Sequence, residues 1–152
     1  MVFEGELVIV LNEPASEEEL VFFARTVFEF PSPTFVICNS PPSVKKGVAE
    51  VNRIAGNMGR SVLIVPDWGA AIEMFKPERV FYFDHKVTRG LDVRKIAEPL
   101  KADKTVVIVF GTAPLKGMEH LGLESELLLP TAVGIAIYLV QEALNPATPT
   151  LV

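Results

Sequence analysis

The chain has 152 residues, of which 49% are apolar and 22% are charged. This length fits one folding domain with a substantial core, and this composition excludes an intrinsically disordered chain. The formal net charge of −5 argues against a protein that holds nucleic acid by bulk positive charge, so an RNA site would need a local basic patch. A single cysteine, Cys38, excludes an internal disulfide and leaves too few thiolates for a Cys-based zinc site.

The apolar segments are short compared with a membrane span. The longest, Leu127 to Val140, is interrupted by Pro130 and Gly134 and falls below the roughly 20 residues that a spanning helix needs. The first ten residues carry acidic groups where a signal peptide would have basic ones. We therefore expect a cytoplasmic protein with no membrane contact.

Short runs of β-branched and aromatic residues alternate along the chain with longer segments of helical spacing, which is typical of βαβ units. Strands are predicted at Leu7 to Leu11, Thr34 to Cys38, Ser61 to Val65, Val80 to Asp84 and Thr105 to Phe110. The pattern predicts an α/β fold with a mainly parallel sheet of five to six strands and helices on both faces.

Start and stop signals delimit the helices between these strands. Ser16 is a good N-cap, Gly59 a good helix end, and Pro31 and Pro77 are stops. The predicted helices begin at Ser16, Pro42, Pro66 or Asp67, Leu91 and Thr131, and the last one ends at Leu144. Gly111 to Pro130 reads as a loop. We expect one domain over residues 1–144 and a mobile tail over residues 145–152.

The segment after the fifth strand has an unusual order of motifs. A buried strand ends in Phe110-Gly111, a loop with Gly117 follows, and an apolar stretch then breaks at Pro130 before a helix rich in small residues. In open α/β sheets, ligands bind beyond the carboxyl ends of the strands. The loops after Asp84 and Phe110 are therefore the first candidates for a site.

This order resembles the SpoU branch of the SPOUT (SpoU-TrmD) methyltransferase superfamily, and in particular its uncharacterised archaeal-type members. The resemblance rests on Val107 to Gly111, Gly117, Leu128 to Pro130 and Ala132 to Tyr138. It implies a carboxyl-terminal trefoil knot, a homodimer formed through the helix Thr131 to Leu144, and S-adenosylmethionine as cofactor. The residues that the resemblance assigns to cofactor binding are Asp84, Phe110, Gly111, Thr112, Gly117, Leu128, Leu129, Pro130, Thr131 and Ala132.

By the same resemblance the protein would methylate RNA, on a ribose 2′-hydroxyl of tRNA or rRNA, with Arg25 as the catalytic residue. Pairing of Arg25 with Glu29, one helical turn away, is the plainer alternative. The chain departs from the family pattern at two places: Glu17 to Glu19 stand where an Asn is usual, and Thr131-Ala132-Val133 replaces a Ser-Leu-Asn block. The alternative function is therefore a non-catalytic module that binds S-adenosylmethionine or a nucleotide. A flavodoxin-like binding domain is the third hypothesis.

Other patterns are weaker. Two basic clusters are candidates for an RNA contact, one of Lys45, Lys46, Arg53 and Arg60 and the other of Lys86, Arg89, Arg94 and Lys95. Neither His85 nor His120 has a neighbouring histidine at helical spacing, so no metal site is expected. Asp67 with Glu73 and Lys76 lacks the spacing of a metal-dependent, restriction-like nuclease. Trp68 can stack on a base or simply cover the sheet.

Overall fold

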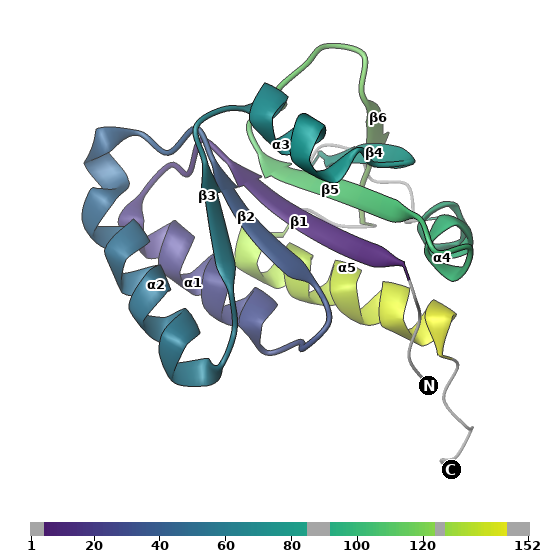
Figure 1. Cartoon of the computed structure of the whole chain (residues 1–152), viewed down its shortest axis with the longest axis horizontal. Coiled ribbons are helices and arrows are strands. Elements are labelled where there is room, and N and C mark those ends of the chain that lie inside the picture. The colour runs from purple at the N-terminus through teal and green to yellow at the C-terminus, as the bar shows by residue number, and fades with distance from the viewer. Residues whose placement is uncertain (1–4, 85–91, 124–126, 146–152) are drawn as a thin grey trace.

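Within the residues that the structure describes, the sheet has six strands, all parallel, in the order β3-β2-β1-β5-β4-β6 (Figure 1). The structure, a computed structural model, describes residues 5–84, 92–123 and 127–145. The strands are β1 (Glu6–Asn12), β2 (Thr34–Cys38), β3 (Val62–Val65), β4 (Arg79–Phe83), β5 (Thr105–Gly111) and β6 (Glu119–Leu121). The predicted α/β class and parallel sheet are confirmed.

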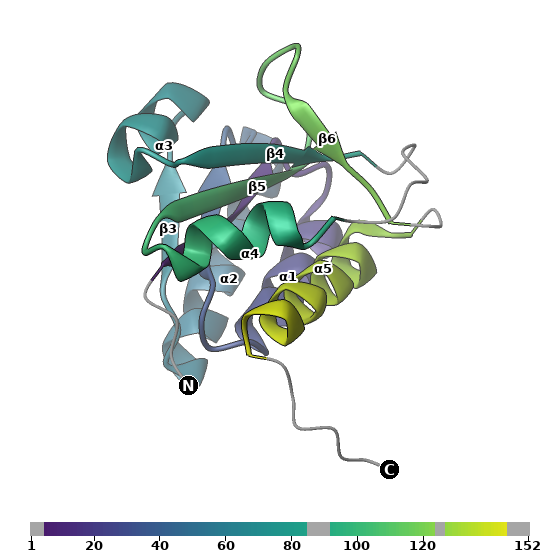
Figure 2. The same cartoon turned by 90° about the vertical axis from the view of Figure 1, so that its right-hand side faces the viewer.

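Helices cover the two faces of the sheet unequally. They are α1 (Glu17–Phe28), the 3-10 helix η1 (Pro42–Val44), α2 (Lys45–Met58), α3 (Trp68–Phe75), α4 (Arg94–Lys101) and α5 (Leu129–Leu144). Figure 1 shows α1, α2 and α5 beneath the sheet and α3 above it. Figure 2 shows that α4 lies on the same side as α5. Helices therefore occupy both faces, as predicted, but one face is covered far more completely.

The capping signals in the sequence act as expected. The Ser16 hydroxyl accepts a hydrogen bond from the Glu19 amide at 3.1 Å, and Asp67 accepts one from the Ala70 amide at 2.8 Å. Gly59 ends α2 in the left-handed conformation, at φ 68°. Each cap satisfies polar backbone groups that a helix end leaves unpaired, so local chemistry alone fixes these boundaries.

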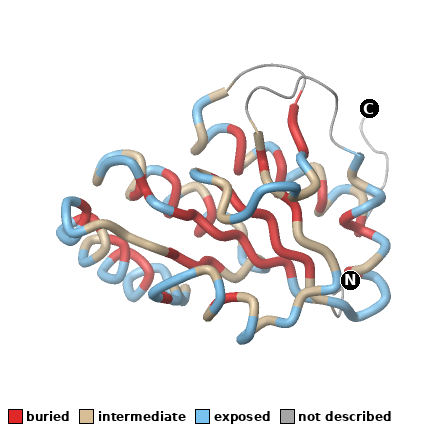
Figure 3. Tube along the Cα trace, turned by 90° about the horizontal axis from the view of Figure 1, so that it is seen from above, coloured by how far each residue is buried: buried red, intermediate tan, exposed pale blue. Residues whose placement is uncertain are grey.

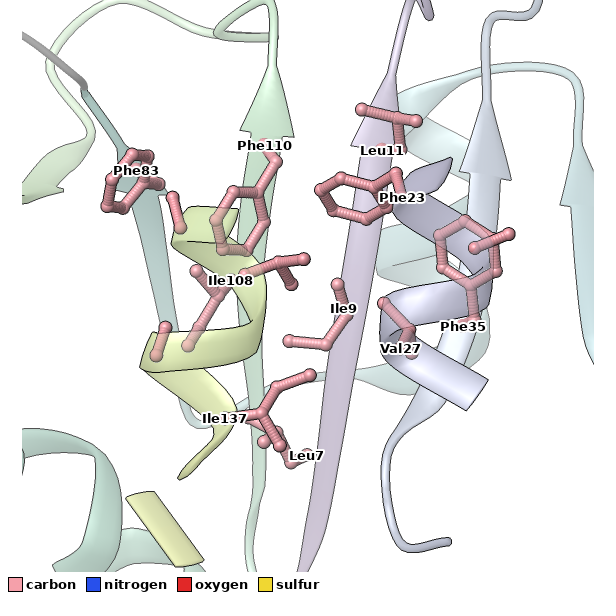
Figure 4. Close-up of a cluster of buried hydrophobic side chains, with 14 of the residues drawn as sticks. Leu7, Ile9, Leu11, Phe23, Val27, Phe35, Phe83, Ile108, Phe110 and Ile137 are labelled. Atoms are coloured by element: carbon pink, nitrogen blue, oxygen red, sulfur yellow. The ribbon is translucent and has the colours of Figure 1, made fainter. Parts of the chain in front are cut away.

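The larger core lies between the sheet and the helices α1, α2, α4 and α5. Its centre is aromatic: the Phe23 ring lies 5.3 Å from that of Phe110 and 5.7 Å from that of Phe35, and Phe83 stacks on Phe110 at 5.1 Å (Figure 4). A smaller core lies on the opposite face under α3. The central strands are therefore buried on both faces (Figure 3), which explains their nearly continuous apolar sequences.

The sixth strand corrects the sequence prediction, because β6 lies inside the stretch from Gly111 to Pro130 that was predicted as a loop. It is only three residues long, and it includes Glu119 and His120. A strand this short and polar has no periodic signal of its own. It forms because β4 supplies hydrogen-bonding partners along the edge of the sheet, with Tyr82 opposite His120.

Three predictions concern segments that the structure does not describe. The trefoil knot depends on the path of residues 85–91 and 124–126, and the tail depends on residues 146–152; these lie outside the described residues, so both stay predictions. The fourth helix was predicted from Leu91, which also lies outside them, and within the described part it begins at Arg94. No helix of the described chain is long and apolar enough to cross a membrane.

Leu20→Ala should lower the free energy of unfolding by about 2–5 kcal/mol, because Leu20 is fully buried beneath the sheet and truncation leaves a cavity. Urea denaturation monitored by circular dichroism measures this change. Leu115→Ala is the matched control: its side chain is 58% exposed, and the expected change is within about 0.5 kcal/mol. Equal effects of the two substitutions would contradict this placement of the core.

Candidate functional site

The carboxyl ends of the strands form one edge of the molecule, where the arrowheads of β1, β2 and β5 gather in Figure 1. β2 lies on one side of β1 and β5 on the other. The order of the chain therefore reverses between Asn12 and Gly111, which pair in register. Ligands of open α/β sheets bind at such a reversal. Asp84 directly follows β4 at the same edge, which makes this edge the candidate site.

The Asn12 side chain ties three strand ends together. It is 1% exposed, its amide donates to the Thr112 carbonyl at 2.7 Å, and its oxygen accepts from the Asn39 amide at 2.8 Å. The Thr112 backbone amide in turn donates to the Asn12 carbonyl at 3.1 Å. A buried amide with these bonds made stabilises the edge, whereas an unsatisfied one would cost about 1–3 kcal/mol.

Cys38 lies beside this junction as an inert thiol. It is fully buried, and burial, reinforced by the negative charges of Asp67 and Glu13, raises its pKa to about 11. Because the thiolate is the reactive form of cysteine, the protonated Cys38 has no role as a nucleophile at neutral pH. The chemistry of the edge must come from other groups.

Gly111 is required by the close approach of β1. It has φ 94°, and a Cβ atom at this position would lie 2.3 Å from the Asn12 carbonyl oxygen. Gly117 has φ 79°, but a Cβ atom there would meet nothing within 4 Å. The two glycines that define the predicted cofactor loop therefore differ in role: Gly111 holds the strands together, and Gly117 gives the loop an open, left-handed turn.

A second polar network joins β4, β5 and β6 at the same edge. The Tyr82 hydroxyl donates to the Gly111 carbonyl at 2.7 Å, and the His120 Nδ1 atom lies 3.0 Å from an Asp84 carboxylate oxygen. The Tyr82 and His120 rings meet edge to face, 5.3 Å apart. Burial and the charge of Asp84 raise the pKa of Tyr82, so its hydroxyl stays protonated and continues to donate.

His120 is the residue of this network that sequence reasoning missed. No metal-ligand spacing surrounds it in the sequence, and Asp84 lies 36 positions away. Only the pairing of β6 with β4 brings the two side chains together. A strand at Glu119–Leu121 is the feature that brings His120 to Asp84, and its three residues carry no strand signal of their own.

The ten predicted cofactor residues divide by exposure. Thr112, Gly117, Leu128 and Thr131 are exposed, and Asp84, Gly111, Leu129 and Pro130 are half-buried, whereas Phe110 and Ala132 are buried. The Phe110 ring packs between Phe23 and Phe83, so a ligand at this edge would meet only its backbone. Residues 85–90, the remainder of the first predicted loop, lie outside the described residues.

Arg25 lies away from this edge, near the far end of α1. Its side chain is exposed on α1, eight residues from the helix start, which corresponds to about 12 Å along the axis. The pKa of Glu50 on α2 is lowered mainly by its hydrogen bond to Arg53 and to a smaller degree by the charge of Arg25. No ion pair with Glu29, the alternative role, occurs in the described part of the chain.

The basic clusters are largely paired with acidic groups or backbone oxygens. Arg53 bonds to Glu50, Arg60 donates to the Phe28 carbonyl, and Lys95 bonds to Glu119 at 2.9 Å. Lys86 and Arg89 fall outside the residues that the structure describes. In the first cluster Arg60 joins the ends of α1 and α2, whereas Arg53 pairs within α2. The second cluster remains a candidate through Arg94, whose side chain is 82% exposed and lies 3.6 Å from Asp92.

The residues of the restriction-like pattern, Asp67, Glu73 and Lys76, all belong to or cap the single helix α3. Asp67 is the N-cap of α3 and Lys76 its C-cap, so these two residues lie at opposite ends of the helix. Over residues 5–84, 92–123 and 127–145 there is no group of three or more His, Cys, Asp or Glu side chains that could hold a metal ion.

The fold is that of the SpoU-type methyltransferases. A probable methylase family protein from Haemophilus influenzae aligns over 94% of this chain and 66% of its own, with a TM-score of 0.68 and 20% identity. The SpoU methyltransferase AviRb from Streptomyces viridochromogenes, solved in complex with AdoMet (S-adenosylmethionine), aligns over 93% of this chain and 62% of its own, with a TM-score of 0.62 and 15% identity. At these identities the likeness establishes the fold. This chain is thus about two thirds as long as those neighbours.

Residues 43–133 match the family described as RecB-family nuclease (DUF2122). The chain therefore belongs to that family. It is also 27% identical over 82 residues to the "Putative type II restriction enzyme MjaORF1200P" of Methanocaldococcus jannaschii, which covers 53% of this chain and 56% of that protein. The chain spans about half the length of this curated relative. The motifs singled out in the sequence do not indicate this family.

Gly111→Ala should destabilise the fold by more than about 2 kcal/mol, because it adds both a contact with the Asn12 carbonyl and a strained φ. Gly117→Ala is the matched control and should cost only the conformational strain, about 1–2 kcal/mol. Urea unfolding of the two variants measures the difference. If Gly117→Ala is the more damaging substitution, the proposed close approach of β1 and β5 is wrong.

Proposed function

We propose that this chain is an S-adenosylmethionine-dependent RNA methyltransferase that modifies a ribose 2′-hydroxyl of tRNA or rRNA. The observation that supports the proposal is the shared fold, whose topology aligns over nearly the whole chain with a SpoU methyltransferase solved with AdoMet. A tRNA modifying enzyme of the TrmH/SpoU type from A. aeolicus shares the fold as well, with a TM-score of 0.54 and 12% identity. Bound S-adenosylmethionine supplies an activated methyl group.

The residues at the carboxyl edge fit such a cofactor in their chemistry. Leu128 is 80% exposed and offers an apolar surface for an adenine ring, and the hydroxyls of Thr112 and Thr131 lie on exposed residues. The open turn at Gly117 leaves backbone groups accessible. Sites for small cofactors combine apolar walls with a few polar groups in this way.

Arg25 is the catalytic residue in this proposal. A guanidinium offers hydrogen-bond donors and no acceptor, so Arg25 would orient the RNA phosphate and the ribose hydroxyl rather than remove the proton unaided. Glu17 to Glu19 replace the Asn of related enzymes, and this replacement favours the alternative of a module that binds the cofactor without catalysis.

A nuclease is the second candidate, and the observation that favours it is the family match over residues 43–133. In that case the RNA or DNA would be cleaved, with no dependence on S-adenosylmethionine. Incubating labelled RNA and DNA with the protein, Mg²⁺ and no cofactor tests it. Cleavage that the Asp84→Asn variant abolishes would replace methyl transfer as the conclusion.

Leu128→Glu should weaken S-adenosylmethionine binding at least tenfold, because it places a charge where the adenine would pack, while the exposed position keeps the fold intact. Isothermal titration measures the affinity.

Arg25→Ala should keep the affinity of wild type and reduce methyl transfer to unmodified tRNA and rRNA by at least a hundredfold. Lys101→Ala, an exposed cation at the end of α4, is the control. Absence of cofactor binding by the wild type would overturn the proposal, and binding without transfer would favour the non-catalytic module.

We also propose that two copies associate through α5. Ile135 and Tyr138 project from one exposed face of this helix, with side chains 38% and 55% exposed, and Phe22 on the neighbouring α1 is 60% exposed. Figure 2 shows α1 and α5 side by side. Large apolar side chains grouped on one surface favour a protein interface.

Tyr138→Glu should convert a dimer to a monomer in sedimentation velocity experiments, because it would bury a charge at the proposed contact. Met74→Glu introduces the same charge at an exposed position of α3, on the opposite face of the sheet, and should leave the dimer intact. A wild-type protein that sediments as a monomer at all concentrations would rule out this interface.

A further inference from the structure

A histidine held by a carboxylate lies where β4 and β6 meet at the carboxyl edge of the sheet. The His120 Nδ1 atom is 3.0 Å from an Asp84 carboxylate oxygen, and the two side chains are 41% and 21% exposed. A carboxylate offers hydrogen-bond acceptors only, so Nδ1 is the donor of this pair. In the neutral ring the other nitrogen, Nε2, then carries no proton, and it forms no hydrogen bond to any residue that the structure describes. The pair therefore has a proton acceptor on a side chain that solvent reaches.

The backbone and a tyrosine ring hold this pair in place. The Asp84 amide donates to the Leu121 carbonyl at 2.8 Å, which continues the pairing of β4 with β6 as far as Asp84. The Tyr82 ring meets the His120 ring edge to face at 5.3 Å, and its hydroxyl donates to the Gly111 carbonyl at 2.7 Å. These contacts restrict the orientation of the imidazole, and a catalytic base depends on such a fixed orientation.

The same tyrosine connects the pair to the loop proposed for the cofactor. Gly111 ends β5 where that loop begins, and Gly117, its open turn, precedes His120 by three residues. The imidazole thus lies beside strand ends that the cofactor proposal uses, whereas Arg25 lies near the far end of α1. A ribose hydroxyl must lose its proton when it is methylated, and a guanidinium has no acceptor for that proton. His120 has the acceptor that Arg25 lacks.

We propose that His120 is the catalytic base that removes the proton from the ribose 2′-hydroxyl of the RNA, an inference that rests on the proposed methyltransferase function. In this step Nε2 takes the hydroxyl proton while the hydroxyl oxygen forms a bond to the methyl carbon. The bond from that carbon to sulfur breaks and its electron pair stays on sulfur, so the positive charge moves from the sulfur to the imidazolium.

Asp84 is a positioning residue in this proposal. The resemblance assigns it to cofactor binding, but its carboxylate is bonded to His120. A carboxylate in this place keeps the proton on Nδ1, leaves Nε2 free to accept, and stabilises the imidazolium once it forms. Glu13, which follows β1 at the same edge, is the competing base; its side chain is exposed, and no hydrogen bond within the described residues orients it.

The tautomer of His120 tests the proposal without cofactor or RNA. The chain has two histidines, and the His120→Gln variant identifies the signals of His120 in long-range proton–nitrogen NMR spectra, recorded at a pH where free imidazole is neutral. We expect the proton on Nδ1 in wild type and a shift of the proton toward Nε2 in Asp84→Asn, because an amide can donate to Nδ1. A wild-type proton on Nε2, or a tautomer that Asp84→Asn leaves unchanged, would overturn the proposal.

Methyl transfer to unmodified tRNA and rRNA tests the role in catalysis. His120→Ala and Asp84→Asn should each reduce transfer at least a hundredfold, with the wild-type affinity for S-adenosylmethionine in isothermal titration. Free imidazole should raise transfer by His120→Ala at least tenfold and leave the wild type unchanged, since it replaces the missing ring. A merely structural role of His120 gives no such rescue.

Glu13→Gln is the matched control, because it removes an exposed carboxylate at the same edge and should transfer methyl groups as wild type does. Circular dichroism shows that the variants fold. Wild-type transfer by His120→Ala, no rescue by imidazole, or an equal loss in Glu13→Gln would overturn the assignment of the base and leave the proposed function standing. A wild type that binds no S-adenosylmethionine overturns the proposed function and the base together, so titration of the wild type separates the two failures.

Discussion

The close approach of β1 and β5 is the constraint on which the rest of the structure depends. Asn12 and Gly111 face each other at the ends of these strands, and no side chain fits on Gly111 without displacing the Asn12 carbonyl. The buried Asn12 amide donates across the junction to the Thr112 carbonyl, and its oxygen accepts a hydrogen bond from Asn39, which follows β2. Because this junction is where the chain order reverses, it fixes both the sheet and the starting points of the loops that form the candidate site.

The two faces of the sheet differ because helices cover them unequally. Four helices bury one face around a cluster of phenylalanine rings, and α1 and α5 present apolar side chains outward from that layer. In the part of the chain that the structure describes, α3 alone covers the other face, and a pocket lined by α3, β4 and the segment before β6 opens there. This pocket and the proposed interface between copies therefore lie on opposite faces of the sheet.

Family description and fold point to different chemistries. The chain belongs to a family described as RecB-family nuclease, yet its topology is that of SpoU-type methyltransferases. Function resides in a site rather than in a fold, and the two proposals use the groups of the molecule differently: methyl transfer needs the apolar Leu128 and the exposed threonines for a cofactor, and hydrolysis uses the Asp84 carboxylate itself. The cofactor requirement separates the two, since methyl transfer needs a methyl donor and hydrolysis does not.

The sequence by itself determined the local elements. Ser16, Asp67 and Gly59 fixed helix ends through hydrogen bonds to nearby backbone or through a left-handed turn, and apolar runs such as β5 identified buried strands. Tertiary structure decided what depends on distant partners. β6 forms only against β4, and His120 meets Asp84 only through that pairing. Trp68 and Met118 line one pocket only because both lie on the same face of the sheet. Local hydrogen bonds and periodicity extend over a few residues, whereas these contacts join segments tens of residues apart, where one sequence contains no pairing signal.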